Sequence, residues 1–168
     1  GNRFMGIKTV SIIGLGALGI LFGNHLAQKI PKENLRIIAD PDRIEKYKKS
    51  GVYCNGKICN FNYVTPEEKD TTADLLLFTV KYDGLKDAIQ AVQNQVGENT
   101  IILSALNGII SEEIIGDAFG MDKVLYCVAQ GMDAVKIDNK LTYHNMGMLC
   151  FGDGEPGMVS DKVKRVAA

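Results

Sequence analysis

The 168-residue sequence lacks an excess of charge of either sign. Its 19 Lys and Arg are matched by 20 Asp and Glu, for a formal net charge of -1 at pH 7. A nucleic-acid-binding domain needs a clustered surplus of basic residues. The one dense basic stretch, Lys46, Lys48 and Lys49, lies in a helix-like segment and is typical of a solvated helix face. The charge pattern therefore favours no nucleic-acid partner.

Metal-binding side chains are also scarce. The four cysteines, Cys54, Cys59, Cys127 and Cys150, have no short paired spacing, and there are only two histidines. Because a zinc site needs several such ligands at close spacing, we expect no metal site. We expect the cysteines to be reduced and partly buried.

No apolar run approaches the roughly 18 residues that a membrane span requires. Residues 1–5 have neither the charged region nor the apolar region of a secretory signal. We therefore expect a cytoplasmic protein without membrane contact. With 46% hydrophobic residues, the chain suits a globular domain that buries about 70% of its unfolded surface.

Strand-like and helix-like segments alternate along most of the chain. Apolar, β-branched runs predict strands at 7–13, 35–39, 75–80, 100–106 and 124–129. Helical spacing predicts helices at 17–29, 41–50 and 85–96, and a further helix capped by Ser111. This alternation predicts an α/β fold that is Rossmann-like and doubly wound, with a mostly parallel sheet.

Two segments depart from the alternation. Asn55-Gly56 predicts a hairpin within 52–64, which we interpret as an antiparallel excursion from the main sheet. After residue 129, short strands are predicted at 133–137, 141–144 and 148–152, with a turn at Asp138-Asn139. These strands form a strand-rich C-terminal extension of the sheet domain.

Gly14, Gly16 and Gly19 have the spacing G-x-G-x-x-G between the first strand and the first helix. In a dinucleotide-binding loop, one glycine makes the tight turn, another lets the backbone approach a pyrophosphate, and the third allows close helix–strand packing. The helix N-terminus then faces the anion. We predict that the loop Gly14-Leu15-Gly16-Ala17-Leu18-Gly19 binds a dinucleotide. The alternative is a glycine turn in an α/β domain without a ligand.

Asp40 follows the second predicted strand, 21 positions after Gly19. A carboxylate at this place accepts hydrogen bonds from the adenosine ribose and repels a 2′-phosphate, which favours NAD(H). Arg43 is close enough in sequence to reach such a phosphate. Asp40 is equally suited to cap the helix that begins at Pro41, and the two roles are compatible.

Two more polar residues follow predicted strands. Lys81 follows the strand at 75–80, and Asn107 follows the strand at 100–106. Open α/β sheets bind ligands at this carboxyl edge, so both side chains are expected to face one cleft. The alternatives are a surface lysine and an Asn-Gly turn.

In this order, these motifs resemble the amino-terminal domain of the ketopantoate reductase (2-dehydropantoate 2-reductase) family. The resemblance rests on the glycine loop, on Phe78-Thr-Val-Lys81, on Leu106-Asn-Gly108 and on the run 144–152. It implies NADP(H) as the cofactor, with Lys81 and Asn107 contacting both cofactor and substrate. It also implies an NAD(P)H-dependent reductase that converts 2-dehydropantoate to pantoate in pantothenate and coenzyme A biosynthesis.

Two features depart from the family pattern. Asp40 stands where the family usually has an arginine for the 2′-phosphate, so NAD(H) stays open as the cofactor. The family's general-acid lysine lies in a helical second domain, so we expect no catalytic residue in this chain and no activity from it alone. We divide the chain into an N-terminal extension (1–6), the dinucleotide-binding domain (7–156) and the start of a helix leading to an absent helical substrate domain (157–168).

Two other functions stay open. A hydroxy-acid dehydrogenase, such as a 3-hydroxyisobutyrate or glycerol-3-phosphate dehydrogenase, shares this architecture. A regulatory module would bind NAD(P) without catalysis. The expected partner is a small-molecule 2-oxo acid substrate, with neither nucleic acid nor membrane, and a homodimer is compatible with the sequence.

Overall fold

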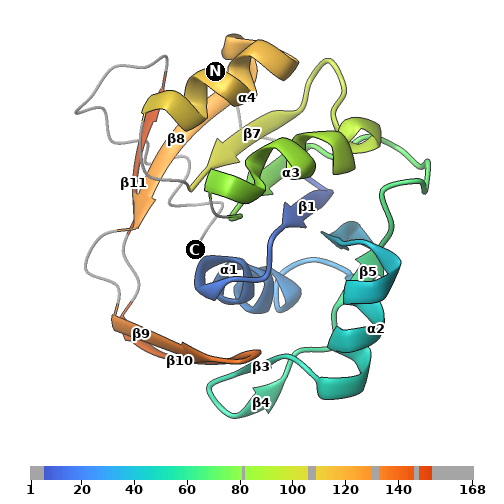
Figure 1. Cartoon of the computed structure of the whole chain (residues 1–168), viewed down its shortest axis with the longest axis vertical. Coiled ribbons are helices and arrows are strands. Elements are labelled where there is room, and N and C mark those ends of the chain that lie inside the picture. Colours follow the sequence, from blue (N-terminus) through green and yellow to red (C-terminus); the bar gives the residue numbers. More distant parts are fainter. Residues whose placement is uncertain (1–5, 81, 106–108, 130–132, 146–147, 153–168) are drawn as a thin grey trace.

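The structure is a computed structural model, and it describes residues 6–80, 82–105, 109–129, 133–145 and 148–152. Within them the backbone forms two β-sheets, and α1 (Ala17–Ala27) lies between the sheets (Figure 1). The segment predicted as the start of a final helix, 157–168, lies outside the described residues.

The larger sheet has seven strands in the order β11-β8-β7-β6-β1-β2-β5. All are parallel except β11, which pairs antiparallel with β8. Counted along the chain, the parallel strands stand in the order third, second, first, fourth, fifth and sixth, the order of dinucleotide-binding sheets. The strands are β1 (Val10–Ile13), β2 (Leu35–Ile38), β5 (Asn62–Val64), β6 (Leu75–Phe78), β7 (Ile101–Ser104), β8 (Val124–Ala129) and β11 (Met148–Gly152). The predicted Rossmann-like fold is confirmed.

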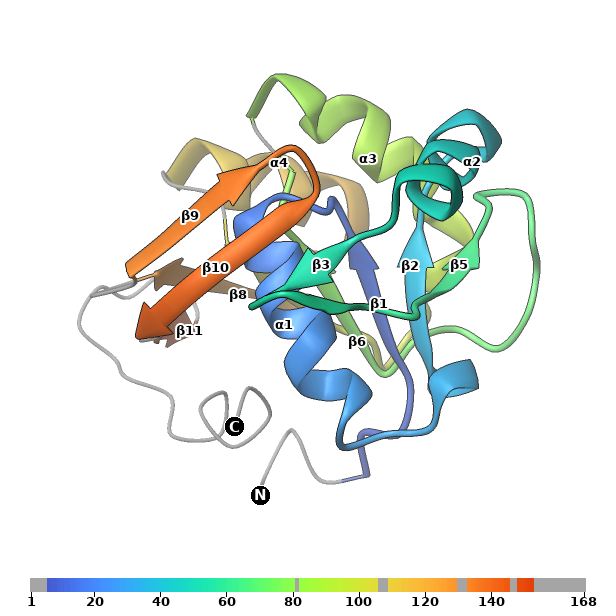
Figure 2. The same cartoon turned by 90° about the horizontal axis from the view of Figure 1, so that it is seen from below.

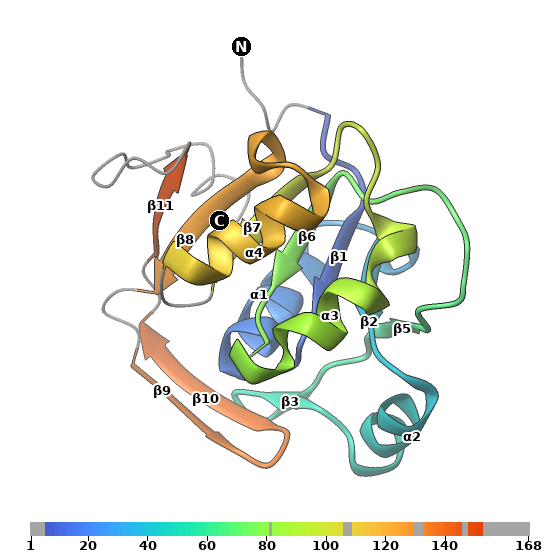
Figure 3. The ribbon, with the colours of Figure 1, turned by 45° about the horizontal axis from the view of Figure 1, so that its top comes forward.

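Helices cover both faces of this sheet. α1 lies on one face, while α3 (Leu85–Ala91) and α4 (Ile109–Phe119) lie on the other (Figure 3). Because both faces are covered, a central strand is apolar at every position. In β6, Leu75 and Leu77 pack toward α1, and Leu76 and Phe78 pack toward α3. This explains why the strand shows no polar alternation in the sequence.

The smaller sheet has four strands in the order β4-β3-β10-β9 and covers α1 on the side away from the larger sheet (Figure 2). Buried Cys54 and Leu141 from this sheet join the same apolar cluster as α1. The predicted Asn55-Gly56 turn is confirmed: it joins β3 to β4, and both residues have positive φ. The strands are β3 (Tyr53–Cys54), β4 (Lys57–Ile58), β9 (Asp133–Ile137) and β10 (Lys140–Asn145).

Some predicted elements differ from the structure. The end of the segment 52–64 was predicted as part of an antiparallel excursion, but β5 pairs in parallel with β2, whose outer edge would otherwise be open. Ser111 does not cap α4, because the helix already begins at Ile109. α2 (Pro41–Ser50) has the predicted bounds. The helix predicted at 85–96 ends at Ala91, and the chain continues as a 3₁₀ turn, Gln93–Gln95.

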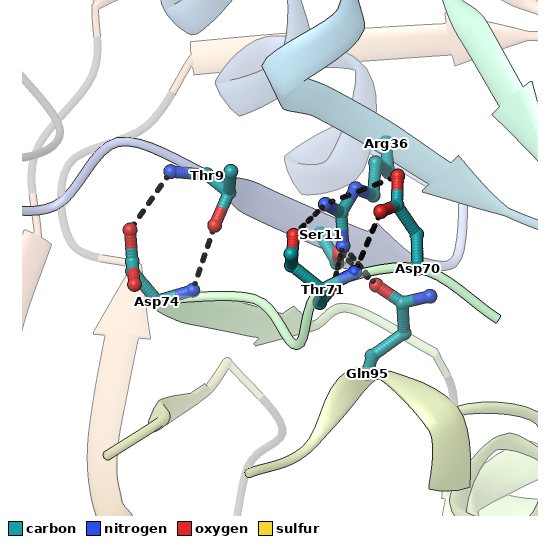
Figure 4. A network of polar contacts seen from close by, with 7 residues as sticks. All are labelled: Thr9, Ser11, Arg36, Asp70, Thr71, Asp74 and Gln95. Atoms are coloured by element: carbon teal, nitrogen blue, oxygen red, sulfur yellow. Dashed lines mark hydrogen bonds and ion pairs between the residues drawn. The ribbon is translucent and has the colours of Figure 1, made fainter.

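A buried polar network lies at the amino edge of the larger sheet (Figure 4). Arg36 of β2 is 4% exposed. Its guanidinium donates to the Thr71 carbonyl oxygen (2.6 Å), the Thr71 Oγ1 (3.0 Å) and the Gln95 Oε1 (3.1 Å). Ser11 of β1 donates to the same Gln95 oxygen at 2.6 Å. One buried cation thus joins β2 to the loop before β6 and to the turn after α3.

A second contact beside this network aligns β1 with β6. The Asp74 carboxylate accepts from the backbone N–H groups of Lys8 and Thr9 at 2.8 and 3.1 Å. The Thr9 hydroxyl oxygen accepts from the Asp74 N–H at 3.0 Å. These reciprocal bonds hold the starts of the two strands between which the strand order reverses.

We predict that Arg36→Met destabilises the fold by about 3 kcal/mol, because the part-buried acceptors on Thr71 lose their donor and the buried Gln95 oxygen loses its charged donor. For a chain of this length, that corresponds to a fall of roughly 6 to 12 °C in melting temperature, measured by thermal unfolding. Arg43→Met is the matched control, because the Arg43 side chain is 65% exposed and its ion pair is long. Equal melting temperatures for the two variants would contradict a structural role for the network.

Candidate functional site

A cavity of about 750 Å³ opens at the carboxyl edge of the larger sheet, where β1, β2 and β6 end. It lies where the strand order reverses, between β1 and β6, which is the place where open α/β sheets bind ligands. Its walls come from the glycine loop, the end of β2, the first turns of α2, one side of α3, and β9 with the turn that follows it.

Two of the three glycines are required by the protein itself. Gly14 has φ +103°, and a Cβ there would lie 2.9 Å from backbone atoms of Thr79 and Val80. A Cβ on Gly19 would overlap the carbonyl oxygen of Gly14. Gly14 therefore makes the tight turn, and Gly19 lets α1 pack directly against that turn.

Gly16 has no such internal requirement. It lines the cavity, and the nearest heavy atom to a Cβ placed there is the Thr79 carbonyl oxygen, 3.8 Å away. A side chain at this position would project into space that the protein leaves open. No close contact within the described residues therefore requires a glycine here, and the approach of a ligand to the backbone at Gly16 stays a prediction.

The side chains of the other loop residues belong to the core. Leu15 is 6% exposed, and Ala17 and Leu18 pack partly buried against the apolar cluster around α1. The loop therefore offers backbone groups to the cavity. Gly16 is the N-cap residue of α1, where no side chain caps the helix and the first turn has no acidic residue. The positive end of the helix dipole is left without a competing carboxylate.

Thr79, which follows β6, holds the glycine loop in place. Its backbone N–H donates to the Ile13 carbonyl oxygen at 3.0 Å. Its hydroxyl is within hydrogen-bonding distance of the same oxygen (3.2 Å) and of the Gly14 carbonyl oxygen. Our sequence reasoning missed this role. The available signal was a hydroxyl residue directly after the strand that neighbours the glycine-loop strand.

Asp40 is the N-cap residue of α2, as one of the two interpretations predicted. Its Oδ1 accepts from the Arg43 N–H at 2.8 Å, and its Oδ2 lies 3.9 Å from the Arg43 Nε. Both side chains line the cavity and are more than half exposed. The cap therefore leaves the carboxylate and the guanidinium accessible to a ligand.

Tyr47, one turn after Arg43, extends the same wall of the cavity and was also missed. Its ring stacks on Tyr63 with centroids 5.6 Å apart, and Phe61 meets Tyr63 edge-on at 6.4 Å. Burial raises the pKa of the Tyr63 hydroxyl to about 12, with smaller contributions from Tyr47 and Cys59. The aromatic stack gives α2 a rigid support beside the ligand cavity.

Lys81 and Asn107 lie outside the described residues, so their meeting at one cleft stays a prediction. The described neighbours of Lys81 do line the cavity: Thr79 and Val80 precede it, and Asp83 follows it. The cavity thus reaches the segment in which a side chain at position 81 is expected.

Cys54 and Cys59 are free and buried. Burial, with a smaller effect of Cys54, raises the pKa of the Cys59 thiol to about 11, which makes it a poor nucleophile at neutral pH. In the part of the chain that the structure describes, no group of three or more His, Cys, Asp or Glu side chains is arranged to hold a metal ion. The helices of that part also include none that is long and apolar enough to cross a membrane.

The chain matches a known protein family and several of its members. The sequence profile of "Ketopantoate reductase PanE/ApbA" matches residues 10–155. The 2-dehydropantoate 2-reductase of Streptococcus pyogenes serotype M1 is 29% identical over 111 residues, which cover 63% of this chain and 35% of that protein. The enzyme of Aquifex aeolicus is 26% identical over 114 residues, covering 68% and 36%. The alignments thus span about a third of the length of these relatives.

Solved structures share the fold. A putative 2-dehydropantoate 2-reductase from Enterococcus faecalis is 24% identical, with a TM-score of 0.69 over 84% of this chain and 48% of the other. The enzyme from Geobacter metallireducens is 19% identical, with a TM-score of 0.74 over 95% and 55%. A D-mandelate dehydrogenase with NADH and anilino(oxo)acetate is 23% identical, with a TM-score of 0.72 over 94% and 54%. Because the family profile matches most of its length, the chain belongs to the ketopantoate reductase family.

Proposed function

We propose that this chain is the cofactor-binding part of a 2-dehydropantoate 2-reductase, which reduces 2-dehydropantoate to pantoate with hydride from a nicotinamide dinucleotide. The observation that carries the proposal is the cavity between β1 and β6, with Gly16 open toward it, in a chain from a family of NAD(P)H-dependent oxidoreductases. Because the chain spans about a third of its curated relatives, the reaction is proposed for the full-length protein. A homodimer and a cytoplasmic location belong to the same proposal.

In this proposal the chain's own residues bind and orient the cofactor. The backbone at Gly16 and the N-terminus of α1 bind the pyrophosphate. Asp40 and Arg43 lie at the start of α2, just after β2, where the adenosine ribose is bound in such sheets. When bound, the nicotinamide ring supplies the hydride. Lys81 and Asn107 are proposed to contact cofactor and substrate, and the lysine that protonates the new alkoxide is proposed to lie in another part of the full-length protein.

The second candidate is a related hydroxy-acid dehydrogenase. It is favoured by the fold shared with the NADH-bound D-mandelate dehydrogenase and by the carboxylate of Asp40, which suits a ribose without a 2′-phosphate. No described feature favours a regulatory module in the same way. NADP(H), implied by the family resemblance, is our first choice of cofactor, and NAD(H) is the alternative.

The test is oxidation of NADPH and of NADH by the full-length protein with 2-dehydropantoate and a panel of other 2-oxo acids. The proposal expects the highest kcat/KM with 2-dehydropantoate. A higher value with another 2-oxo acid would establish the dehydrogenase alternative. Cofactor binding without turnover of any substrate would overturn both enzymatic assignments.

Gly16→Ala and Gly19→Ala should fail in different ways. We expect Gly16→Ala to fold, with a melting temperature within roughly 4 °C of wild type, because its Cβ meets nothing closer than 3.8 Å. Its dinucleotide affinity should fall at least about tenfold, since the backbone no longer reaches the pyrophosphate. Gly19→Ala should lose stability, about 1–3 kcal/mol or more, because its Cβ overlaps the Gly14 carbonyl. Unchanged dinucleotide affinity of Gly16→Ala, measured by calorimetry, would contradict the assigned loop.

Asp40→Ala should weaken NADH binding and, if the carboxylate repels a 2′-phosphate, strengthen NADPH binding several-fold. It should also lose about 1 kcal/mol of stability with the helix cap. Asp40→Asn is the matched control, because asparagine keeps a capping oxygen and removes the charge. Titration of reduced cofactor fluorescence measures both affinities. If neither variant changes either affinity, Asp40 is a helix cap only.

A further inference from the structure

We propose that the β9–β10 hairpin is part of the cofactor site and that Lys136 binds a phosphate group of the dinucleotide, beside Arg43. The inference rests on the proposed dinucleotide binding and assigns a specificity role to the strand-rich extension, which the sequence motifs did not connect with the cofactor. Lys136 and Asn139 both line the cavity, although they lie about 120 residues after the glycine loop.

The register of the hairpin directs Lys136 toward the cavity. Lys136 stands opposite Leu141, which is 1% exposed and packs in the cluster around α1. Residues directly opposite each other project from the same face of a sheet. Lys136 therefore shares the inner face with Leu141, whereas Val135 and Ile137 are on the outer face, 58% and 68% exposed. Figure 2 shows the hairpin running alongside α1, whose N-terminus borders the same cavity.

Hydrogen bonds to the β3–β4 hairpin hold this position. The Asn139 carbonyl oxygen accepts from the Tyr53 N–H at 2.8 Å, and the Leu141 carbonyl oxygen accepts from the Asn55 N–H at 2.7 Å. The Asn55 side-chain oxygen accepts from the Tyr143 N–H at 2.9 Å. These bonds hold the turn and β10, and β9, the strand that carries Lys136, is held through its antiparallel pairing with β10. A strand fixed in this way gives Lys136 the kind of support that a binding residue needs.

The charges around the cavity leave Lys136 available for an anion. Of the described residues, three carboxylates (Asp40, Asp83 and Asp87) and two cations (Arg43 and Lys136) line it. Arg43 is already paired with Asp40. The ion pairs found among the described residues are Arg36–Asp70, Arg43–Asp40 and Lys123–Asp122. Lys136 is in none of these, so among the described residues it has no carboxylate partner. An entering phosphate could therefore pair with its charge, near the positive end of α1.

The test is Lys136→Gln in the full-length protein, with dissociation constants for NADPH and NADH measured by titration of cofactor fluorescence. We expect a loss of affinity of about fivefold to twentyfold, the size of a lost charge-assisted hydrogen bond at a partly exposed site. A loss for NADPH alone would assign Lys136 to the 2′-phosphate. An equal loss for both cofactors would assign it to the pyrophosphate. In either case the dependence of affinity on salt should weaken, because one phosphate contact is lost.

Lys140→Gln is the matched control. Lys140 is on the same hairpin but faces outward, with its Nζ 5.6 Å from the centroid of the Tyr53 ring. Its affinities should stay within about twofold of wild type, since its charge is outside the cavity. Wild-type affinities in Lys136→Gln, or equal losses in both variants, would overturn the inference while leaving the proposed function intact. Failure of the wild-type protein to bind either cofactor would instead reject the proposed function.

Discussion

The site depends on one close contact, the packing of the first turn of α1 against the glycine loop. No side chain fits between Gly19 and the Gly14 carbonyl, and the neighbouring Thr79 holds that carbonyl from the end of β6. This contact sets the angle at which α1 leaves the sheet, and therefore where its N-terminus opens into the cavity. The cavity is consequently a property of how β1, β6 and α1 pack, and it exists before any ligand arrives.

The two sheets pack on opposite sides of α1 and have different roles. The larger sheet supplies the edge at which a ligand is held, and the smaller sheet covers the opposite side of the helix. The inner face of the smaller sheet is apolar at Cys54 and Leu141, and Lys136 on the same face lines the cavity. The strand-rich segment after residue 129 therefore contributes residues both to the apolar core and to the wall of the cavity. The network around Arg36 holds the amino edge of the larger sheet, opposite the edge at which the cavity opens.

Local signals in the sequence were sufficient for much of the fold. The positive φ of Gly14 and Asn55 and the cap at Asp40 follow from residue chemistry within a few positions, and all three were predictable. The pairing of β5 with β2 was not, because a parallel partner leaves no local pattern. Tyr47 and Lys136 were missed for a related reason: each reaches the cavity only through tertiary packing. Thr79 was missed although its position directly after a strand was a usable signal. The roles of Lys81 and Asn107 were inferred from their places after predicted strands and from the family resemblance. Both residues lie outside the described part of the structure.

The smaller sheet also bears on how quickly the chain reaches its native state. It joins segments far apart in sequence, as the bond between Tyr143 and Asn55, 88 residues apart, illustrates. Closing so long a loop is slow compared with forming the local βα units. During synthesis, the outer apolar side of α1 therefore stays uncovered until residues near 145 have left the ribosome.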